Sequence, residues 1–289
     1  FVLPYEKLVI EGIQTRHDLP VYTHTCGRIG DRLELMEETG TNGIDTLDPP
    51  PLGDVELGDA KRRIGKRLFI KGNMDPEKLK NTVKKYGKDK ISFVRMEATT
   101  NLIGGQPFSM ANLREIRRIC DEHVLTLIVD GSLICENAYL IKQREKGYEK
   151  KTVAEIVREI CSIPDLYYMS GRKNTSVRGG FIATNNKQLF DKIRPWLPVY
   201  EGFYTYGGMS MREIGAMSVG RREMGDPDVA GCSIEQIKYV VNKLVNAGIP
   251  VVTPPGGLAC HLDAKRFVPH LPQSEYPAGA LAAAIYLAS

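Results

Sequence analysis

The sequence lacks several features that would assign its class at once. It has no Cys-x-x-Cys pair, and its six cysteines are scattered through the apolar stretches of a 289-residue chain. Small secreted domains held by disulfides look different, so we expect reduced thiols in a cytoplasmic protein. No apolar run approaches the roughly 18 residues that a membrane-spanning helix needs, which argues against a membrane protein. The first residues contain no methionine and no signal pattern, so the chain is expected to begin inside a domain.

An excess of charge of one sign is also missing. The 39 Lys and Arg residues nearly balance the 35 Asp and Glu residues, which gives a net charge of +4. This balance gives no case for nucleic acid as the main partner. Hydrophobic residues make up 42% of the chain, as is ordinary for a globular protein, and the length predicts about two domains.

What the sequence does contain is an alternation of short apolar runs with amphipathic segments. Strands are expected at 21–24, 43–48, 68–72, 91–96, 125–130, 166–170 and 181–184, with a further strand pair at 250–253 and 258–262. Helices are expected at 5–15, 29–39, 54–64, 76–86, 110–122, 152–161, 187–193, 211–223, 234–247 and 278–287. This alternation predicts an α/β fold with a mainly parallel sheet.

Two residues in this pattern could carry chemistry. Asp130 ends the buried strand 125–130, and Lys173 follows the strand 166–170. Ligands of open α/β sheets bind beyond the carboxyl ends of the strands. A lysine placed there indicates a Schiff base with an aldehyde, and an aspartate opposite it would pair with the protonated ring nitrogen of pyridoxal phosphate. A loop lysine and a strand-end aspartate are also common in purely structural roles, so these two residues alone leave both interpretations open.

Longer motifs carry a resemblance from about residue 75 to the end. The matching stretches, in chain order, are Thr100–Pro107, Val129–Asp130, Glu136–Glu145, Met169–Lys173, Gly179–Gly180 and Glu201–Gly208. They resemble the aromatic amino-acid β-eliminating lyases, the family of tyrosine phenol-lyase and tryptophanase. The resemblance implies a pyridoxal phosphate enzyme of fold type I that acts on an aromatic or related amino acid. It also implies a homo-oligomer, if the chain folds, and a monovalent cation as a further cofactor.

The resemblance assigns roles to four residues. Lys173 matches the Schiff-base lysine, and Asp130 matches the partner of the pyridine nitrogen. Asn101 matches the residue that bonds the 3-oxygen of the cofactor, and Ser170 matches a phosphate contact. The chain departs from the family pattern at Leu133, where an arginine is usual.

A second departure lies at Gly256-Gly257-Leu258, where the family usually has Gly-Gly-His. The family segments that supply the main phosphate loop, the stacking ring and the substrate-carboxylate arginine are also missing. Each lost charge-assisted hydrogen bond removes about 1.5–3 kcal/mol of binding free energy. An inactive lyase chain is therefore an alternative expectation.

The first 76 residues show a different pattern. His24 and Cys26, two residues apart at a strand end, are a zinc-type ligand pair, although two ligands do not make a site and a structural role for both is the alternative. The stretches Tyr22–Gly27, Asp48–Val55 and Lys71–Pro76 resemble the uroporphyrinogen decarboxylase family and its corrinoid methyltransferases. The resemblance implies about three βα units of TIM-barrel type, too few to close a barrel.

These two resemblances predict three domains: a barrel fragment at 1–76, a lyase large-domain segment at 77–230 and a partial small domain at 231–289. No Pro/Gly/Ser linker separates the first two, so the join near residues 72–76 looks like two spliced fragments. A zinc-dependent methyltransferase module and a non-catalytic chimeric chain are the alternatives to the lyase.

Overall fold

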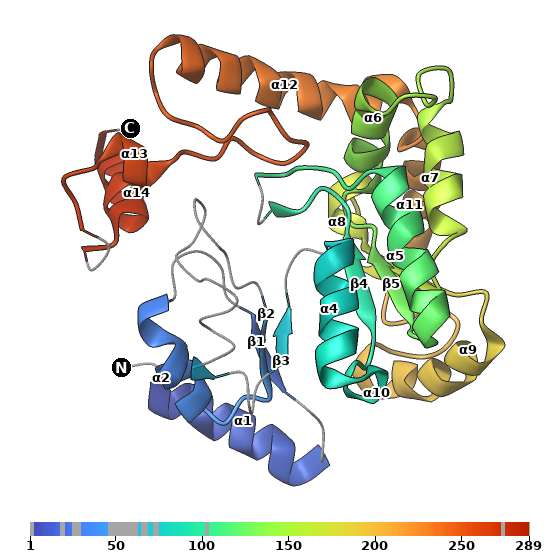
Figure 1. Ribbon diagram of the computed structural model, residues 1–289. Coiled ribbons are helices and arrows are strands. Elements are labelled where there is room, and N and C mark those ends of the chain that lie inside the picture. The colour runs from blue at the N-terminus through green and yellow to red at the C-terminus, as the bar shows by residue number, and fades with distance from the viewer. Residues whose placement is uncertain are drawn as a thin grey trace.

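Two separate β-sheets form the framework of the protein. The computed structural model describes residues 3–17, 21–24, 30–45, 63–64, 69–71, 75–101, 104–272 and 275–288 (Figure 1). The first sheet has the order β1 (Tyr22–His24), β2 (Gly43–Asp45), β3 (Phe69–Lys71), and all three strands are parallel. The second sheet has the order β4 (Val94–Glu97), β5 (Leu127–Asp130), β6 (Leu166–Ser170), β7 (Gly180–Ala183). The expected α/β fold with a mostly parallel sheet is confirmed.

The first sheet is small, with three residues in each strand. Helix α1 (Leu3–His17) precedes it, and the 3-10 turn η1 (Gly30–Arg32) with α2 (Leu33–Glu38) connects β1 to β2. The helix expected at 54–64 lies almost wholly outside the described residues. A parallel three-stranded sheet occurs in many α/β folds, so the TIM-barrel character of this part stays a prediction.

The second sheet holds the main hydrophobic core. Its strands β4, β5 and β6 are parallel, whereas β7 runs antiparallel to β6. The core is closed by the helices α4 (Pro76–Tyr86), α5 (Met110–His123), α6 (Ile134–Arg144) and α7 (Val153–Cys161). Burial alternates along β4 and β5 because successive side chains point to opposite faces of the sheet. One face is therefore apolar and covered by helices, and the other carries half-buried polar groups.

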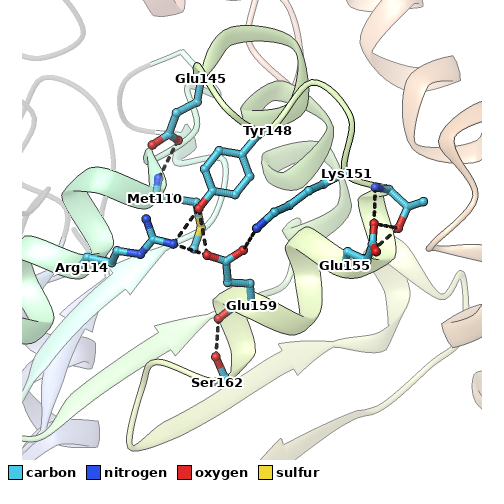
Figure 2. A network of polar contacts seen from close by, with 9 residues as sticks. Met110, Arg114, Glu145, Tyr148, Lys151, Glu155, Glu159 and Ser162 are labelled. Carbon is cyan, nitrogen blue, oxygen red and sulfur yellow. Dashed lines mark hydrogen bonds and ion pairs between the residues drawn. The ribbon is translucent and has the colours of Figure 1, made fainter.

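Polar contacts join α5 and α7 to the connection between α6 and α7 (Figure 2). The Glu145 carboxylate accepts hydrogen bonds from the backbone N–H groups of Met110 at 2.8 Å and Ala111 at 3.0 Å, so it caps the N-terminus of α5. On α7, Glu159 accepts from Tyr148 Oη at 2.8 Å and from Lys151 Nζ at 2.6 Å, and it also pairs with Arg114 of α5. The network therefore links α5, the α6–α7 connection and α7.

The remaining helices follow β6 and β7 in chain order. They are α8 (Gly171–Asn174), α9 (Lys187–Ile193), α10 (Leu197–Tyr200), α11 (Met211–Glu223), α12 (Pro227–Asn246), α13 (Ala264–Phe267) and α14 (Pro277–Ala288), with the 3-10 turn η4 (Arg194–Trp196) after α9. The 3-10 turn η2 (Lys88–Lys90) lies earlier, between α4 and β4. The long helix α12 begins beside α6 and leads to the C-terminal elements (Figure 1). Among the described residues, no helix is both long and apolar enough to cross a membrane. The predicted boundaries at residues 76/77 and 230/231 stay predictions.

Candidate functional site

Asp130 lies at the carboxyl end of β5, as predicted, and its carboxylate is held from two sides. Oδ1 accepts hydrogen bonds from the backbone N–H of Ser132 at 3.0 Å and from Ser132 Oγ at 2.6 Å. Oδ2 pairs with a guanidinium nitrogen of Arg95 at 3.3 Å. Only 14% of the Asp130 side chain is exposed, so its orientation is fixed by these partners.

Arg95 is the centre of a small polar cluster on the half-buried face of the sheet. It donates to Tyr168 Oη at 2.8 Å and pairs with Glu97 at 3.0 Å in addition to Asp130. The register explains the cluster, since Glu97 pairs with Asp130, and Asp130 with Tyr168, on adjacent strands. Burial, with the nearby Asp130 charge, raises the pKa of Tyr168, which keeps this phenol protonated.

Lys173 and Ser170 lie at the same edge of the sheet as Asp130. Ser170 is the last residue of β6, and its backbone N–H donates to Ser132 Oγ at 3.1 Å. Ser132 thus connects the ends of the two neighbouring strands. Lys173 follows on the short helix α8 and is exposed. The fold therefore brings these three predicted residues to one edge, where the carboxyl ends of β5 and β6 meet.

A buried carboxyl group that sequence reasoning missed stands next to Lys173. Glu136, on α6, accepts a hydrogen bond from Asn174 Nδ2 at 2.6 Å, and Asn174 Oδ1 accepts from the backbone N–H of Cys135 at 3.2 Å. Burial raises the pKa of Glu136, although the Asn174 hydrogen bond and the Lys173 charge act against the rise. These contacts fasten α8, and with it Lys173, to the start of α6.

The loop that follows β4 carries Asn101, and a second missed residue holds this loop. Asn137 of α6 is fully buried. Its Oδ1 accepts from the backbone N–H groups of Thr99 at 3.0 Å and Phe108 at 3.1 Å, and its Nδ2 donates to the Phe108 carbonyl at 3.1 Å. In the sequence, the stretch Glu136–Glu145 served only as a family motif, and no local pattern marked Asn137 as the residue that holds this loop.

The segment after α12 closes on this loop. The backbone N–H of Gly257 donates to the Gly105 carbonyl at 2.7 Å, and a Cβ at Gly105 would lie 2.6 Å from the Leu258 carbonyl oxygen. This close approach, with a positive φ of 71°, explains the glycine at position 105. His261 reaches across, and its Nε2 lies 2.8 Å from Asn101 Oδ1. The expected strand pair here consists of a single antiparallel bridge between Val251 and Leu262.

Leu133, the departure from the arginine of the family pattern, is part of the packing. Its side chain is buried, and its carbonyl accepts a hydrogen bond from Thr99 Oγ1 at 3.0 Å. Position 133 therefore contributes no cation to the edge that holds Asp130.

A cavity of about 420 Å³ lies elsewhere, between α7, β7 and α11. Its lining includes Cys161, Tyr167, Phe181 and Met224, with Arg221. None of the four predicted cofactor residues lines it.

The predicted zinc pair falls largely outside the described residues. His24 ends β1, but its side chain and all of Cys26 lie outside them. Across the described ranges, no group of three or more His, Cys, Asp or Glu side chains could hold a metal ion. The zinc site therefore stays a prediction.

Comparison with known sequences points to one family. The model of the family described as "Beta-eliminating lyase" matches residues 24–287. The chain is 45% identical over 221 residues to a tyrosine phenol-lyase of Symbiobacterium sp. (strain SC-1), covering 76% of this chain and 48% of the relative. A tyrosine phenol-lyase of Intrasporangium calvum is 43% identical over 237 residues, covering 82% of this chain and 50% of the relative. The chain thus spans about half the length of the curated relatives it matches.

Comparison with solved structures supports the fold. A putative L-allo-threonine aldolase from Listeria monocytogenes superposes with a TM-score of 0.50 at 17% identity, over 88% of this chain and 61% of that chain. The family match also includes residues 24–76, and no comparison supports the uroporphyrinogen decarboxylase assignment made for the first 76 residues. The chain belongs to the beta-eliminating lyase family.

Proposed function

We propose that this chain is a pyridoxal phosphate-dependent lyase that eliminates a group from Cβ of an aromatic or related amino acid. One observation carries the proposal: Asp130 ends β5 and Lys173 follows β6, and these strands are parallel neighbours, so both residues lie at the carboxyl edge of the sheet. Membership of the beta-eliminating lyase family and the 41–45% identity to tyrosine phenol-lyases support the same chemistry.

The groups at this edge suit the cofactor. Lys173 is exposed, so its amine is accessible to an aldehyde, and Asp130 offers a fixed carboxylate to a ring N–H. A carboxylate has about four lone-pair sites, so Asp130 keeps acceptor capacity beside Ser132 and Arg95. Asn101 and Ser170 add an amide and a hydroxyl, which are donors for a phenolic oxygen and a phosphate.

The chemical roles proposed for these groups are those that the family resemblance implies. When bound, the cofactor supplies an electron sink for negative charge at Cα of the substrate. Lys173 would hold the cofactor aldehyde and then, as a free amine, would move the proton at Cα through its Nζ. Asp130 would keep the ring nitrogen protonated, Asn101 would donate to the 3-oxygen, and Ser170 would donate to the phosphate.

Further parts of the proposal rest on the sequence and on the family resemblance. An aromatic amino-acid substrate, a homo-oligomer, a cytoplasmic location, a monovalent cation and the domain division at 1–76, 77–230 and 231–289 belong to it. The lyase activity of the chain is also part of the proposal, because the chain spans about half the length of the tyrosine phenol-lyases it matches. The zinc-dependent alternative on His24 and Cys26 stays a sequence prediction that no structural observation favours.

Covalent capture tests the proposal directly. Purified protein is incubated with saturating pyridoxal phosphate, reduced with borohydride and digested, and the modified peptide is identified by mass spectrometry. We expect a single label on Lys173 and a visible absorption band before reduction. Lys173→Ala should abolish both, whereas Lys146→Ala, at an exposed lysine of the surface, should leave both unchanged. An unlabelled Lys173 at saturating cofactor would refute the proposal.

A further inference from the structure

A contact between two distant parts of the chain bears on the amide of Asn101. His261 Nε2 lies 2.8 Å from Asn101 Oδ1, across 160 positions in the sequence. His261 comes from the segment after α12, and Asn101 from the loop after β4. In Figure 1 this loop and the segment that follows α12 approach each other.

The backbone fixes the position of the histidine. The His261 carbonyl accepts a hydrogen bond from the backbone N–H of Val252 at 2.8 Å, next to the bridge between Val251 and Leu262. Further contacts anchor the same segment to the Asn101 loop: Gln106 Nε2 donates to the Pro254 carbonyl at 2.7 Å. The ring of His261 is therefore held near Asn101 by hydrogen bonds within its own segment and between that segment and Gln106.

The protonation of the ring decides what this contact does. Burial lowers the pKa of His261, so the ring is neutral at pH 7 and carries one proton. A neutral ring can donate to Asn101 Oδ1 only with this proton on Nε2. With its oxygen occupied, the amide of Asn101 turns its NH₂ group away from His261. An anionic oxygen of a ligand at the sheet edge then meets a donor instead of a carbonyl.

We propose that His261 is a positioning residue that fixes the amide orientation of Asn101, so that Asn101 presents its NH₂ group to the cofactor oxygen. The cofactor half of this proposal rests on the function proposed above.

The contact itself can be tested without cofactor. In ¹⁵N-labelled protein, the histidine nitrogen shifts report the tautomer of His261, and the side-chain NH₂ signals of Asn101 are assigned by their loss in Asn101→Asp. We expect the proton of His261 on Nε2, and we expect His261→Phe to shift the Asn101 signals. His270→Phe, at an exposed histidine in the same segment, should leave them in place. A bare Nε2, with the amide as donor, would overturn the proposal.

Cofactor affinity tests the consequence. Loss of one neutral hydrogen bond is expected to weaken pyridoxal phosphate binding by about 3- to 10-fold in His261→Phe. His261→Gln, whose Nε2–H replaces the ring donor, should stay within about twofold of the parent chain. In Asn101→Ala, a further His261→Phe change should have no added effect, because the two residues act through one amide.

The results of these experiments distinguish a failure of the positioning role of His261 from a failure of the proposed function. If the parent chain fails to bind pyridoxal phosphate and Lys173 stays unlabelled, the proposed function is refuted, and with it the cofactor half of the inference. If the parent chain binds and His261→Phe binds equally well, the positioning role is refuted while the function stands. Independent losses in the double variant would also refute it.

Discussion

Replacing Asn137 with leucine should destabilise the protein more than any ordinary surface change. Asn137 makes three hydrogen bonds to the loop backbone, at 3.0, 3.1 and 3.1 Å, from a fully buried position. Leucine has the same branching and the same number of side-chain heavy atoms but no polar groups, so the change mainly removes the hydrogen bonds. The N–H groups of Thr99 and Phe108 and one carbonyl lose their partner. At about 1–1.3 kcal/mol for each of the three net bonds, the free energy of unfolding should fall by about 3–4 kcal/mol.

Urea unfolding followed by far-UV circular dichroism measures this effect. A loss of 3–4 kcal/mol is a large part of the 5–15 kcal/mol by which typical domains are stable, so the transition midpoint should move clearly. Asn246→Leu is the matched control, because Asn246 is exposed at the end of α12 and its change should cost about 0.5 kcal/mol or less.

The same variant tests how the loop serves the site. Because Asn137 holds both ends of the loop that carries Asn101, cofactor affinity should fall under conditions where Asn137→Leu is still folded. A change in the free energy of unfolding below about 1 kcal/mol would refute the reasoning, since it would mean that the loop finds other partners at no cost. Unchanged affinity in a destabilised variant would separate the stability role of Asn137 from the site.

Two further predictions concern charged groups. At Glu159, burial opposes ionisation, but the hydrogen bonds from Lys151 and Tyr148 and the charges of Lys151 and Arg114 outweigh it and lower the pKa. The stability lost in Glu159→Gln should therefore be largest near neutral pH and shrink as the pH falls through the lowered pKa; a loss that grows on acidification would contradict this. Arg95→Met should cost about 2 kcal/mol in urea unfolding, because it leaves the Asp130 and Glu97 carboxylates without this cation. Adding Glu97→Gln should recover part of that loss, because it removes the repulsion between the Glu97 and Asp130 carboxylates. No recovery would argue against this repulsion.

The strand ends were predictable from the sequence where local pattern and burial agree. The run 125–130 predicted a strand ending at Asp130, and β5 ends there. The helix expected at 110–122 is α5, since Ser109 caps it and its apolar positions recur at helical spacing. The helix expected at 234–247 begins earlier, at Pro227, because Asp226 caps it and proline suits the first turn.

Helix α6 was not predicted from the sequence, and it shows where local sequence patterns fail. Its buried residues lie on almost every side, including Glu136 and Asn137, so no amphipathic period marks it. The two polar residues become informative only when the fold shows their partners on α8 and on the loop after β4. The contact of His261 with Asn101 spans 160 positions, and no local rule connects residues at that separation.

The division of the framework into two sheets has a consequence for local unfolding and amide hydrogen exchange. Within the described residues, no strand pairing joins β3 to β4, and each strand of the first sheet contributes three residues. Amide protons of β1–β3 should exchange with solvent through small local openings, whereas those of β5, inside the larger core, should exchange only on global unfolding. A ligand at the end of β5 would then slow exchange in the second sheet and leave the first sheet unchanged.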